Sequence, residues 1–572
     1  MRKNFIPSGI AIVLLFFLGF SCKGVHPTAN FGKTAIGKEA MVVTAHPEAT
    51  RVGLEVLANG GNAVDAMVAV HFALAVVYPS AGNIGGGGFM VLRDTVGGTY
   101  SLDFRERAPL AAHQDMYLDE QGEVIPGLSL NGQKAAGVPG SVDGMIKAHE
   151  KFGQLPFKTL IEPAIRLAQK GFEITEQQAG NYNHLRSMFV AHNRDSLDIP
   201  LVKDKPWKKG DILKQIDLAK TLKRIKRQGR EGFYAGETAR LMVEEMEAGN
   251  GIISLEDLRS YESVWREPVI GQYQGYKVIS MGPPSSGGIA LGQLLGMAEH
   301  FDLSSSGYGT APTIHLMTEM ERRVYADRAS HLGDPDYWEV PQQKMLDGEY
   351  LSGRVAEINP NRATPSEEVQ AMDLPDRKES EETTHYSIVD RDGSAVSVTT
   401  TINSSYGSKV FVTGAGFLLN NEMDDFSSKP GVPNLYGLLG GAANAIEPGK
   451  RMLSAMTPTI LEKDNKLFMV VGTPGGSTII TSVFQTILNV IAHDMSMTEA
   501  VKAKRIHHQW KPDDIQTEAG AISDEVRKAL EAMGHKIVQR GSIGRVDAIL
   551  VRPDGSLEGA GDPRGDDWAG GF

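Results

Sequence analysis

The feature that most constrains this chain is an abrupt change of character at Thr383. Residues 373–382 are acidic and poor in apolar side chains, and they show neither a helical nor a strand period. Residues 384–390 alternate and are rich in β-branched and aromatic side chains, which predicts a strand. The sequence therefore predicts a buried strand entered directly from an exposed loop, with a threonine at the junction where that loop would be cut.

Cleavage before Thr383 would turn this threonine into an N-terminal residue. A threonine hydroxyl is almost never ionised near neutral pH, whereas an α-amino group titrates at about 7.7–8.0. A new N-terminal threonine would therefore carry the nucleophile and the general base on one residue. Its β-branched side chain also restricts χ1, which helps to hold Oγ in place. The Thr-Thr dipeptide alone is explained more simply as an ordinary strand start. The choice between a strand start and a cleavage site therefore rests on the other motifs of the chain.

Those motifs resemble the γ-glutamyltranspeptidase (glutathione hydrolase) family, in the order and spacing of its small subunit. The resemblance also extends back through the N-terminal half, and it covers nearly all of the chain after the leader. The motifs of the C-terminal part are Thr383-Thr384-His385-Tyr386-Ser387, Thr401-Ile402-Asn403, Asn420-Asn421-Glu422-Met423-Asp424-Asp425-Phe426, Lys429-Pro430-Gly431-Val432-Pro433-Asn434, Ser454-Ala455-Met456-Thr457-Pro458-Thr459 and Gly472-Thr473-Pro474-Gly475-Gly476-Ser477.

The resemblance implies a fold and a division of the chain. Strands in both halves, mixed with helices and without a regular βαβ rhythm, by themselves suggest an α+β fold. The family implies the four-layer αββα N-terminal nucleophile hydrolase fold, formed jointly by two autoprocessed subunits. Cleavage between Glu382 and Thr383 would give a large subunit, 23–382, and a small catalytic subunit, 383–572, which stay together as a heterodimer.

The implied reaction is acyl transfer. Thr383 Oγ would attack the δ-carbonyl of a γ-glutamyl amide such as glutathione, and water or the amine of an amino acid or dipeptide would resolve the resulting ester. The family position of Thr401 implies that its hydroxyl orients Thr383. Gly475 and Gly476 offer consecutive N–H groups without side chains, which suits an oxyanion hole, and the family uses this pair in that way.

The α-carboxylate and α-ammonium of the γ-glutamyl group need opposite partners. Arg105 lies in an Asp-Phe-Arg-Glu motif, and although most arginines form surface ion pairs, the family implies a bidentate grip on the carboxylate. Ser454 is the second expected carboxylate ligand. Asn403, Glu422 and Asp425 are expected to bind the ammonium.

Three further positions bear on the substrate pocket. Residues 430–441, including Tyr436, resemble the lid loop over the pocket and favour a transpeptidase over the related cephalosporin acylases, which lack this lid. Position 422 carries Glu where some bacterial members carry Gln. Position 455 carries Ala where the family usually has a second serine, which removes a donor worth about 0.5–1.5 kcal/mol.

Composition narrows the partners. The chain has 572 residues and a net charge of −12 without a basic block, which argues against nucleic acid. The glycine-rich segment 80–89 lacks the Lys-Ser/Thr of a phosphate loop and precedes a strand, so close backbone packing is the preferred interpretation. Asp424-Asp425 and His507-His508 lack convergent ligands at metal-binding spacing. We therefore expect no cofactor and no metal.

Residues 1–22 have the pattern of a secretory leader, with a charged start and an apolar run too short to span a bilayer comfortably. The single cysteine, Cys22, lies where cleavage would occur, so lipidation as in bacterial lipoproteins and plain signal-peptide cleavage both stay open. The expected location is periplasmic or secreted, with or without a lipid anchor at Cys22. One cysteine also excludes an intrachain disulfide.

Two expectations concern helices. Residues 155–171 have the pattern of one amphipathic helix, and residues 315–329 that of a helix whose many charges form a solvated face with i,i+4 pairs. Two other functions also remain open at this point. The same fold could serve another amidohydrolase, such as a cephalosporin acylase, or the chain could be a surface lipoprotein that binds peptides without cleaving itself.

Overall fold

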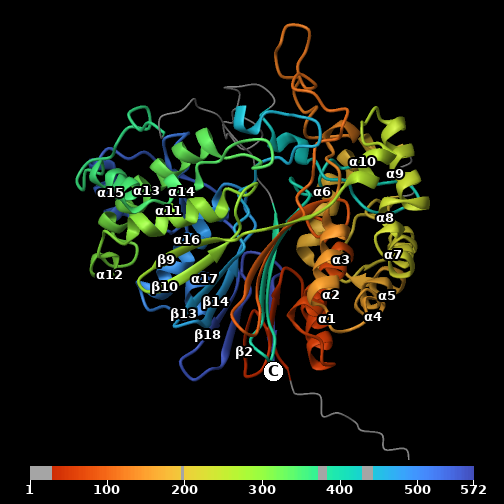
Figure 1. The fold of residues 1–572 in the computed structure, drawn as a ribbon, viewed down its shortest axis with the longest axis horizontal. Coiled ribbons are helices and arrows are strands. Elements are labelled where there is room, and N and C mark those ends of the chain that lie inside the picture. The colour runs from red at the N-terminus through yellow and green to blue at the C-terminus, as the bar shows by residue number, and fades with distance from the viewer. Residues whose placement is uncertain (1–28, 195–198, 372–382, 428–441) are drawn as a thin grey trace, which may run out of the picture.

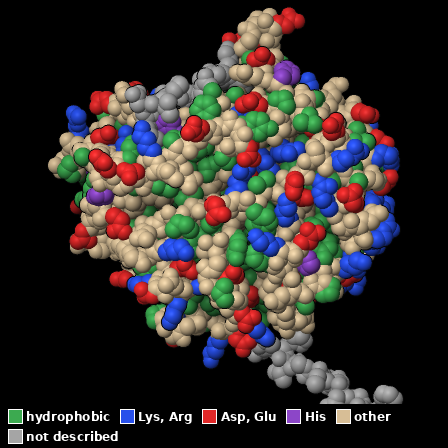
Figure 2. Space-filling model, viewed as in Figure 1, with side chains coloured by type: hydrophobic (Ala, Val, Ile, Leu, Met, Phe, Trp, Pro, Cys, Tyr) green, Lys and Arg blue, Asp and Glu red, His purple; other side chains and the backbone are tan. Residues whose placement is uncertain are grey.

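Two β-sheets lie face to face between two layers of helices (Figure 1). On the face of the molecule seen in the same view, basic and acidic side chains are interspersed (Figure 2). The computed structural model describes residues 29–194, 199–371, 383–427 and 442–572. Its helices and antiparallel sheets confirm the predicted α+β fold with αββα layers.

The eight-stranded sheet interleaves strands from the two sides of Thr383. Every neighbouring pair in it is antiparallel. The hairpin of β11 and β12, whose turn contains Gly393 at φ 81°, lies between β3 and β4. The sheet order is β1 (Asn30–Gly32), β20 (Trp568–Gly571), β3 (Met41–Thr44), β11 (Thr384–Val389), β12 (Ala395–Thr401), β4 (Gly87–Arg93), β5 (Thr99–Asp103) and β8 (Val264–Arg266).

The seven-stranded sheet also mixes the two parts of the chain, and its strands are likewise antiparallel. Its order is β2 (Thr34–Gly37), β19 (Leu557–Ala560), β18 (Asp547–Val551), β14 (Lys466–Gly472), β13 (Thr459–Lys463), β10 (Tyr276–Ser280) and β9 (Val269–Tyr273). The remaining short strands are β6 (Phe172–Glu173), β7 (Ile212–Leu213), β15 (Ile506–His507), β16 (Ile515–Thr517) and β17 (Ile537–Gln539).

One helical layer covers the outer face of the eight-stranded sheet, and the other covers the seven-stranded sheet (Figure 1). The first contains α2 (Ala63–Val77), which is buried all round because its residues are almost all apolar. The other helices of this layer are α1 (Pro47–Ala58), α3 (Ser141–Phe152), α4 (Phe157–Leu160), α5 (Glu162–Lys170), α6 (Glu176–Ala191), α7 (Ile216–Gln228), α8 (Glu231–Tyr234), α9 (Gly236–Ala248) and α10 (Leu255–Ser260).

The second layer is built on α11 (Gly287–Ala298), α13 (Ala311–His331) and α16 (Thr478–Ile491), which contribute to the core under the seven-stranded sheet. The shorter helices on this side are α12 (Leu303–Ser306), α14 (Gln342–Met345), α15 (Gly348–Ala356), α17 (Met497–Lys502) and α18 (Asp524–Ala532). Among the described residues, every helix is too short or too polar to cross a lipid bilayer.

The β11–β12 hairpin separates an apolar face from a polar one. Tyr386 and Ile388 point into the core shared with α1 and α2. On the opposite face, His385 hydrogen-bonds Thr399 Oγ1 at 2.9 Å and Ser387 Oγ at 3.0 Å. Burial lowers the pKa of His385 to about 3, so the ring is neutral. The polar side chains on this face of the hairpin are therefore hydrogen-bonded to one another near its first residues.

Two expectations about helices are wrong. The pattern over residues 155–171 is divided into α4 and α5, because Pro163 fits the first turn of a helix that starts at Glu162 but cannot continue a preceding one. The charged residues of α13 are buried, not solvated. They are Glu319, Glu321, Arg322, Arg323, Asp327 and Arg328, each at most 1% exposed.

The physical reason lies in the polar segment that follows α15. The expected i,i+4 pair forms between Arg323 and Glu319 at 2.8 Å. Glu319 also accepts from Thr364, and Arg322 donates to Ser366 at 2.6 Å. Residues 357–366 thus contact the charged face and supply hydrogen-bond partners to Glu319, Arg322 and Arg323.

A pair of isoleucines tests the assignment of the core. Ile388 on β11 is fully buried, whereas Ile270 on the edge strand β9 is 44% exposed. We expect Ile388→Ala to lower the free energy of unfolding by about 2–5 kcal/mol because it opens a cavity, and Ile270→Ala by no more than about 0.5 kcal/mol. Urea denaturation followed by tryptophan fluorescence compares the two variants, and equal midpoints would contradict this assignment.

Candidate active site

Thr383 lies directly before β11 and is 8% exposed. Because Thr384 pairs with Thr400, the register of the hairpin places Thr383 beside Thr401, the last residue of β12. The glycine-rich segment packs behind this point, since a Cβ on Gly86 would lie 2.1 Å from the Thr401 carbonyl oxygen. The expected close backbone packing of segment 80–89 is confirmed.

Thr401 begins a tight turn that leads to Asn403. Thr401 Oγ1 accepts a hydrogen bond from Asn403 N at 2.7 Å, and Asn403 has a left-handed φ of 64°. Asn403 Nδ2 donates to the Asn421 carbonyl oxygen at 2.9 Å, whereas its Oδ1 has no donor in the part of the chain that the structure describes. The turn thus fixes an amide oxygen near the end of β12.

Gly475 and Gly476 form the connection between β14 and α16, with φ values of 135° and 60°. Both angles lie where residues with a Cβ are strained. Among the described residues, neither N–H group has an acceptor. Two free donors at the N-terminus of a long helix suit a developing negative charge. His507 supports this turn, because its ring bonds Ser477 Oγ at 3.1 Å and Thr481 Oγ1 at 2.9 Å.

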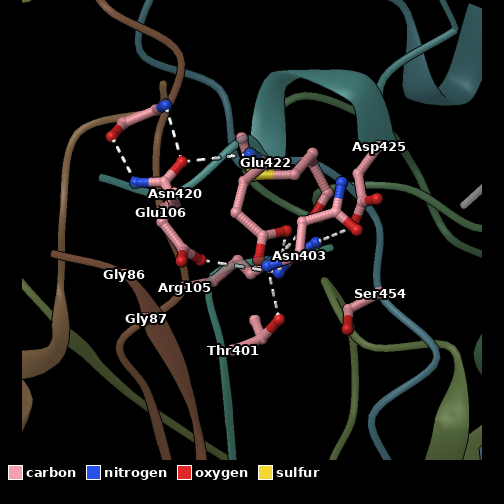
Figure 3. A network of polar contacts seen from close by, with 12 residues as sticks. Gly86, Gly87, Arg105, Glu106, Thr401, Asn403, Asn420, Glu422, Asp425 and Ser454 are labelled. Atoms are coloured by element: carbon pink, nitrogen blue, oxygen red, sulfur yellow. Dashed lines mark hydrogen bonds and ion pairs between the residues drawn. The ribbon is translucent and has the colours of Figure 1, made fainter. Parts of the chain in front are cut away.

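The residues expected to bind the substrate converge around Arg105, which is 1% exposed (Figure 3). Arg105 Nη1 lies 2.6 Å from Glu422 Oε2, and Nη2 pairs with Asp425. Its Nε and Nη2 also donate to the carbonyl oxygens of Met452 and Leu453, both at 3.2 Å. The guanidinium expected to hold a carboxylate is thus paired with the two carboxylates expected to hold an ammonium.

A third carboxylate in this cluster, Glu106, was not identified from the sequence. Its Oε2 lies 3.5 Å from Arg105 Nη1. Burial raises the pKa of Glu106 to about 8, although Arg105 opposes the shift. Burial also raises the pKa of Glu422 well above its usual range, and the charges of Glu106 and Asp425 add to this rise. Since three buried carboxylates share one guanidinium, the cluster holds at least one proton near neutral pH.

The cluster has more acceptors than donors. Apart from the Arg105 ion pair, neither carboxylate oxygen of Glu422 has a hydrogen-bond partner within the described residues. Asp425 Oδ1 and Asn403 Oδ1 are also unpaired there. Buried acceptors without donors are costly. A ligand that brings several N–H donors and a positive charge complements this arrangement.

Asn420 is a second residue whose role the sequence did not reveal. Its Nδ2 donates to the carbonyl oxygens of Gly85 and Gly137, both at 2.8 Å, and its Oδ1 accepts from Gly137 N and Glu422 N. These bonds fix the start of the 3₁₀ helix η3 (Glu422–Asp425) against the glycine-rich segment. The paired asparagines before the acidic run were the signal for this support.

Ser454 lies to the right of the Arg105 guanidinium in this view, on the side opposite Glu106 (Figure 3). Its Oγ accepts from Met456 N at 3.2 Å, and its carbonyl oxygen accepts from both the N–H and the hydroxyl of Ser286. Ala455, which replaces a serine of the family pattern, is 3% exposed. Two expected site residues, Glu382 and Tyr436 of segment 430–441, lie outside the described residues.

His315, Glu319 and His535 converge closely enough to consider a metal ion. However, His315 Nδ1 bonds His535 Nε2 directly at 2.7 Å. Glu319 is already paired with Arg322 and Arg323. These contacts explain the cluster without an ion, and the two arginines oppose the charge of a cation there.

Comparisons with known proteins agree with this geometry. The family profile described as γ-glutamyltranspeptidase matches residues 49–572. The glutathione hydrolase proenzyme of Escherichia coli strain K12 is 46% identical over 536 residues, which cover 94% of this chain and 92% of the relative. The proenzyme of the same name from Pseudomonas aeruginosa is 49% identical over 521 residues, covering 90% and 91%.

The fold is also similar to that of a solved structure, the cephalosporin acylase from Bacillus halodurans. The TM-score is 0.84 at 26% identity, with 94% of this chain and 97% of the acylase covered. The N-terminal nucleophile hydrolase fold, the enzyme class and the family expected from the motifs are confirmed. The match over nearly the whole length shows that this chain belongs to the γ-glutamyltranspeptidase family.

Proposed function

We propose that this protein is a glutathione hydrolase and γ-glutamyltranspeptidase precursor that cuts itself between Glu382 and Thr383. The observation that carries the proposal is the convergence of three features at the start of β11. Thr383 lies at the strand end, the free N–H groups of Gly475 and Gly476 offer an oxyanion hole, and the Arg105 cluster offers charges of both signs. Relatives at 46–49% identity bear the name glutathione hydrolase proenzyme.

Thr383 would act as nucleophile and base in turn. Its freed α-amine takes the proton from Oγ as Oγ attacks the δ-carbonyl of the γ-glutamyl amide. The N–H groups of Gly475 and Gly476 stabilise the oxyanion, and Thr401 orients the Thr383 hydroxyl. The C–N bond of the substrate amide then breaks, and the departing amine takes the proton back from the Thr383 α-ammonium. A γ-glutamyl ester of Thr383 remains. Water or the amine of an amino acid or dipeptide then attacks this ester and restores the enzyme.

The substrate would bind by exchanging partners within the Arg105 cluster. The α-carboxylate takes Arg105 and Ser454, while the α-ammonium takes Glu422, Asp425 and the Asn403 amide oxygen. This exchange is favourable because each charge keeps an opposite partner, and because the unpaired acceptors gain N–H donors. A cephalosporin acylase substrate without an α-amino group would leave these acceptors unpaired, so the cluster favours γ-glutamyl compounds.

The subunit division at Thr383 gives a large subunit, 23–382, and a small subunit, 383–572. Both sheets contain strands from both segments. Separating the products would therefore break backbone ladders along β3, β4, β10 and β20. Cleavage would leave an intact heterodimer without further rearrangement of the sheets.

Removing the nucleophile tests both cleavage and catalysis. We expect Thr383→Ala to remain one polypeptide on a denaturing gel and to show no turnover of γ-glutamyl-p-nitroanilide, because the attacking hydroxyl is lost. Thr383→Ser keeps a hydroxyl and should still cleave, with slower turnover. Mass spectrometry of the native protein should find a chain that begins at Thr383. Turnover by Thr383→Ala, or an intact Glu382–Thr383 bond in active material, would refute the proposal.

The excess of carboxylates predicts a pH-dependent KM. The proton held by the Arg105 cluster disfavours the ammonium, and it is lost as the pH rises toward the raised pKa of Glu106, about 8. We therefore expect KM for the γ-glutamyl substrate to fall as the pH rises from about 6 to about 8. In Glu422→Gln the profile should flatten, because the amide keeps an acceptor oxygen but cannot take up or release a proton.

Steady-state kinetics at several pH values measure this effect. Glu525→Gln, which changes an exposed glutamate of α18, serves as the matched control and should keep the native profile. An unchanged KM profile in Glu422→Gln would show that the cluster does not release a proton when substrate binds.

Residues 1–22 and Cys22 lie outside the described residues, and their roles are part of the proposal. We propose that the leader exports the enzyme to the periplasm or beyond, and that cleavage before Cys22 leaves this cysteine, with a lipid anchor, as the first residue ahead of the large subunit 23–382. On phase separation in Triton X-114, the native protein should enter the detergent phase and Cys22→Ser the aqueous phase. A native protein found in the aqueous phase would overturn the anchor and indicate plain signal-peptide cleavage.

A further inference from the structure

A second compartment opens on Thr383, separate from the Arg105 cluster. Its volume is about 210 Å³, and its lining includes Thr383, Gly475, Tyr78, Ser405, Ser542 and Arg545. None of the five residues expected to bind the γ-glutamyl group lines it. Since one half of the substrate is assigned to the Arg105 cluster, this compartment is free to take the other half, the group joined to the δ-carbonyl.

Arg545 is the one charged side chain among the described residues that line this compartment. Its backbone is tied to the expected oxyanion hole, because Arg545 N donates to Thr473 Oγ1 at 2.7 Å. The preceding Gly544 packs so closely on Gly475 that a Cβ on Gly475 would lie 3.1 Å from Gly544 Cα. The position of Arg545 is thus fixed relative to the reacting carbonyl.

The Arg545 guanidinium is held in place but not saturated. Nη2 pairs with Asp567 Oδ1 at 3.2 Å, Nη1 donates to the Tyr78 hydroxyl, and the guanidinium carbon lies 5.1 Å from the centroid of the Tyr78 ring. Gly565 packs against the Nε edge, where a Cβ would lie 2.7 Å from Nε. A guanidinium carries five N–H donors, and these contacts use two of them. The 15% exposed side chain keeps donors for a ligand.

We propose that this compartment binds the group that leaves Thr383 and the amine that later replaces it, and that Arg545 holds the carboxylate of that group. The inference rests on the proposed function and adds the recognition of the second half of the substrate. The ligands are peptides with a free C-terminal carboxylate, such as the cysteinylglycine part of glutathione or a dipeptide acceptor. A volume below the ~300–1,000 Å³ of sites for whole drug-sized ligands suits half a substrate.

The native enzyme provides the first test, without any variant. Glutathione and its C-terminal carboxamide differ only in the charge that Arg545 would bind. We expect kcat/KM to be about 10- to 100-fold higher for glutathione, as for the loss of one charge-assisted hydrogen bond. Equal values for the two substrates would overturn the role of Arg545. Failure to turn over even γ-glutamyl-p-nitroanilide would instead reject the proposed function.

A variant gives the second test. Arg545→Gln should lower kcat/KM for glutathione about 10- to 100-fold, and should leave γ-glutamyl-p-nitroanilide, whose leaving group has no carboxylate, within about twofold. Arg545→Lys should recover part of the loss, and Arg540→Gln, an exposed arginine bonded to Gln516, should lose nothing. Equal losses on both substrates would show a structural role only. If Arg545→Gln remains uncleaved on a gel, the comparison of glutathione with its carboxamide decides alone.

Discussion

The constraint on which the rest of this structure depends is the position of the β11–β12 hairpin. It lies between β3 and β4, two strands from earlier in the sequence. β11 and β12 pair with each other and, on their outer sides, with β3 and β4. The hairpin therefore cannot shift in register without breaking ladders on both sides. Its first residue, Thr383, inherits this rigidity, although it follows directly on a segment with no predicted structure. A nucleophile at a strand end is positioned by the whole sheet.

The same insertion reconciles self-cleavage with stability. A cut chain stays together only if the elements of one fragment pair with those of the other. Here both sheets contain strands from either side of Thr383, and the last strand, β20, lies between β1 and β3. Each segment thus completes the ladders of the other. The ladders of β11 begin at Thr384, so they do not require the bond before Thr383.

The Arg105 cluster leaves some of its buried polar atoms without hydrogen-bond partners among the described residues. Three carboxylates around one guanidinium leave acceptor atoms without donors. A buried ion pair stabilises little after desolvation, and unpaired buried acceptors cost free energy. A protein core would avoid this arrangement. The proposed function accounts for it, because an α-ammonium would bring the missing donors and the missing charge, while Arg105, fixed by two backbone carbonyl oxygens, would take the carboxylate.

Parts of this picture were within reach of the sequence. The almost wholly apolar run 63–77 indicates a buried helix and matches α2, and the Asp392-Gly393 dipeptide is a turn signal that lies between β11 and β12. Family motifs located Arg105, Glu422, Asp425 and the two glycines. The burial of the α13 charges was not predictable, because periodicity records charge but not the polar segment that covers it. Asn420 and Arg545 were missed because their partners Gly85, Gly137, Tyr78 and Asp567 are distant in sequence. Glu106 directly follows Arg105, but the sequence does not show that both side chains are buried beside Glu422.

The Arg105 cluster and the compartment of Arg545 together would give the enzyme its selectivity among substrates, which the Thr383 hydroxyl alone cannot supply. In the proposed binding mode, the Arg105 cluster takes the α-ammonium and α-carboxylate of the γ-glutamyl half. Arg545 is the one charged residue among the described residues that line the other compartment, and beside its ion pair with Asp567 its remaining N–H donors suit a carboxylate on the other half. Arg105 and Arg545 belong to different segments of the chain, and in the proposed binding mode Thr383 and the Gly475-Gly476 turn lie between the two binding regions. A substrate bound at both would have its amide bond placed at Thr383 Oγ. Selectivity then comes from the distance between two charged anchors rather than from the nucleophile itself.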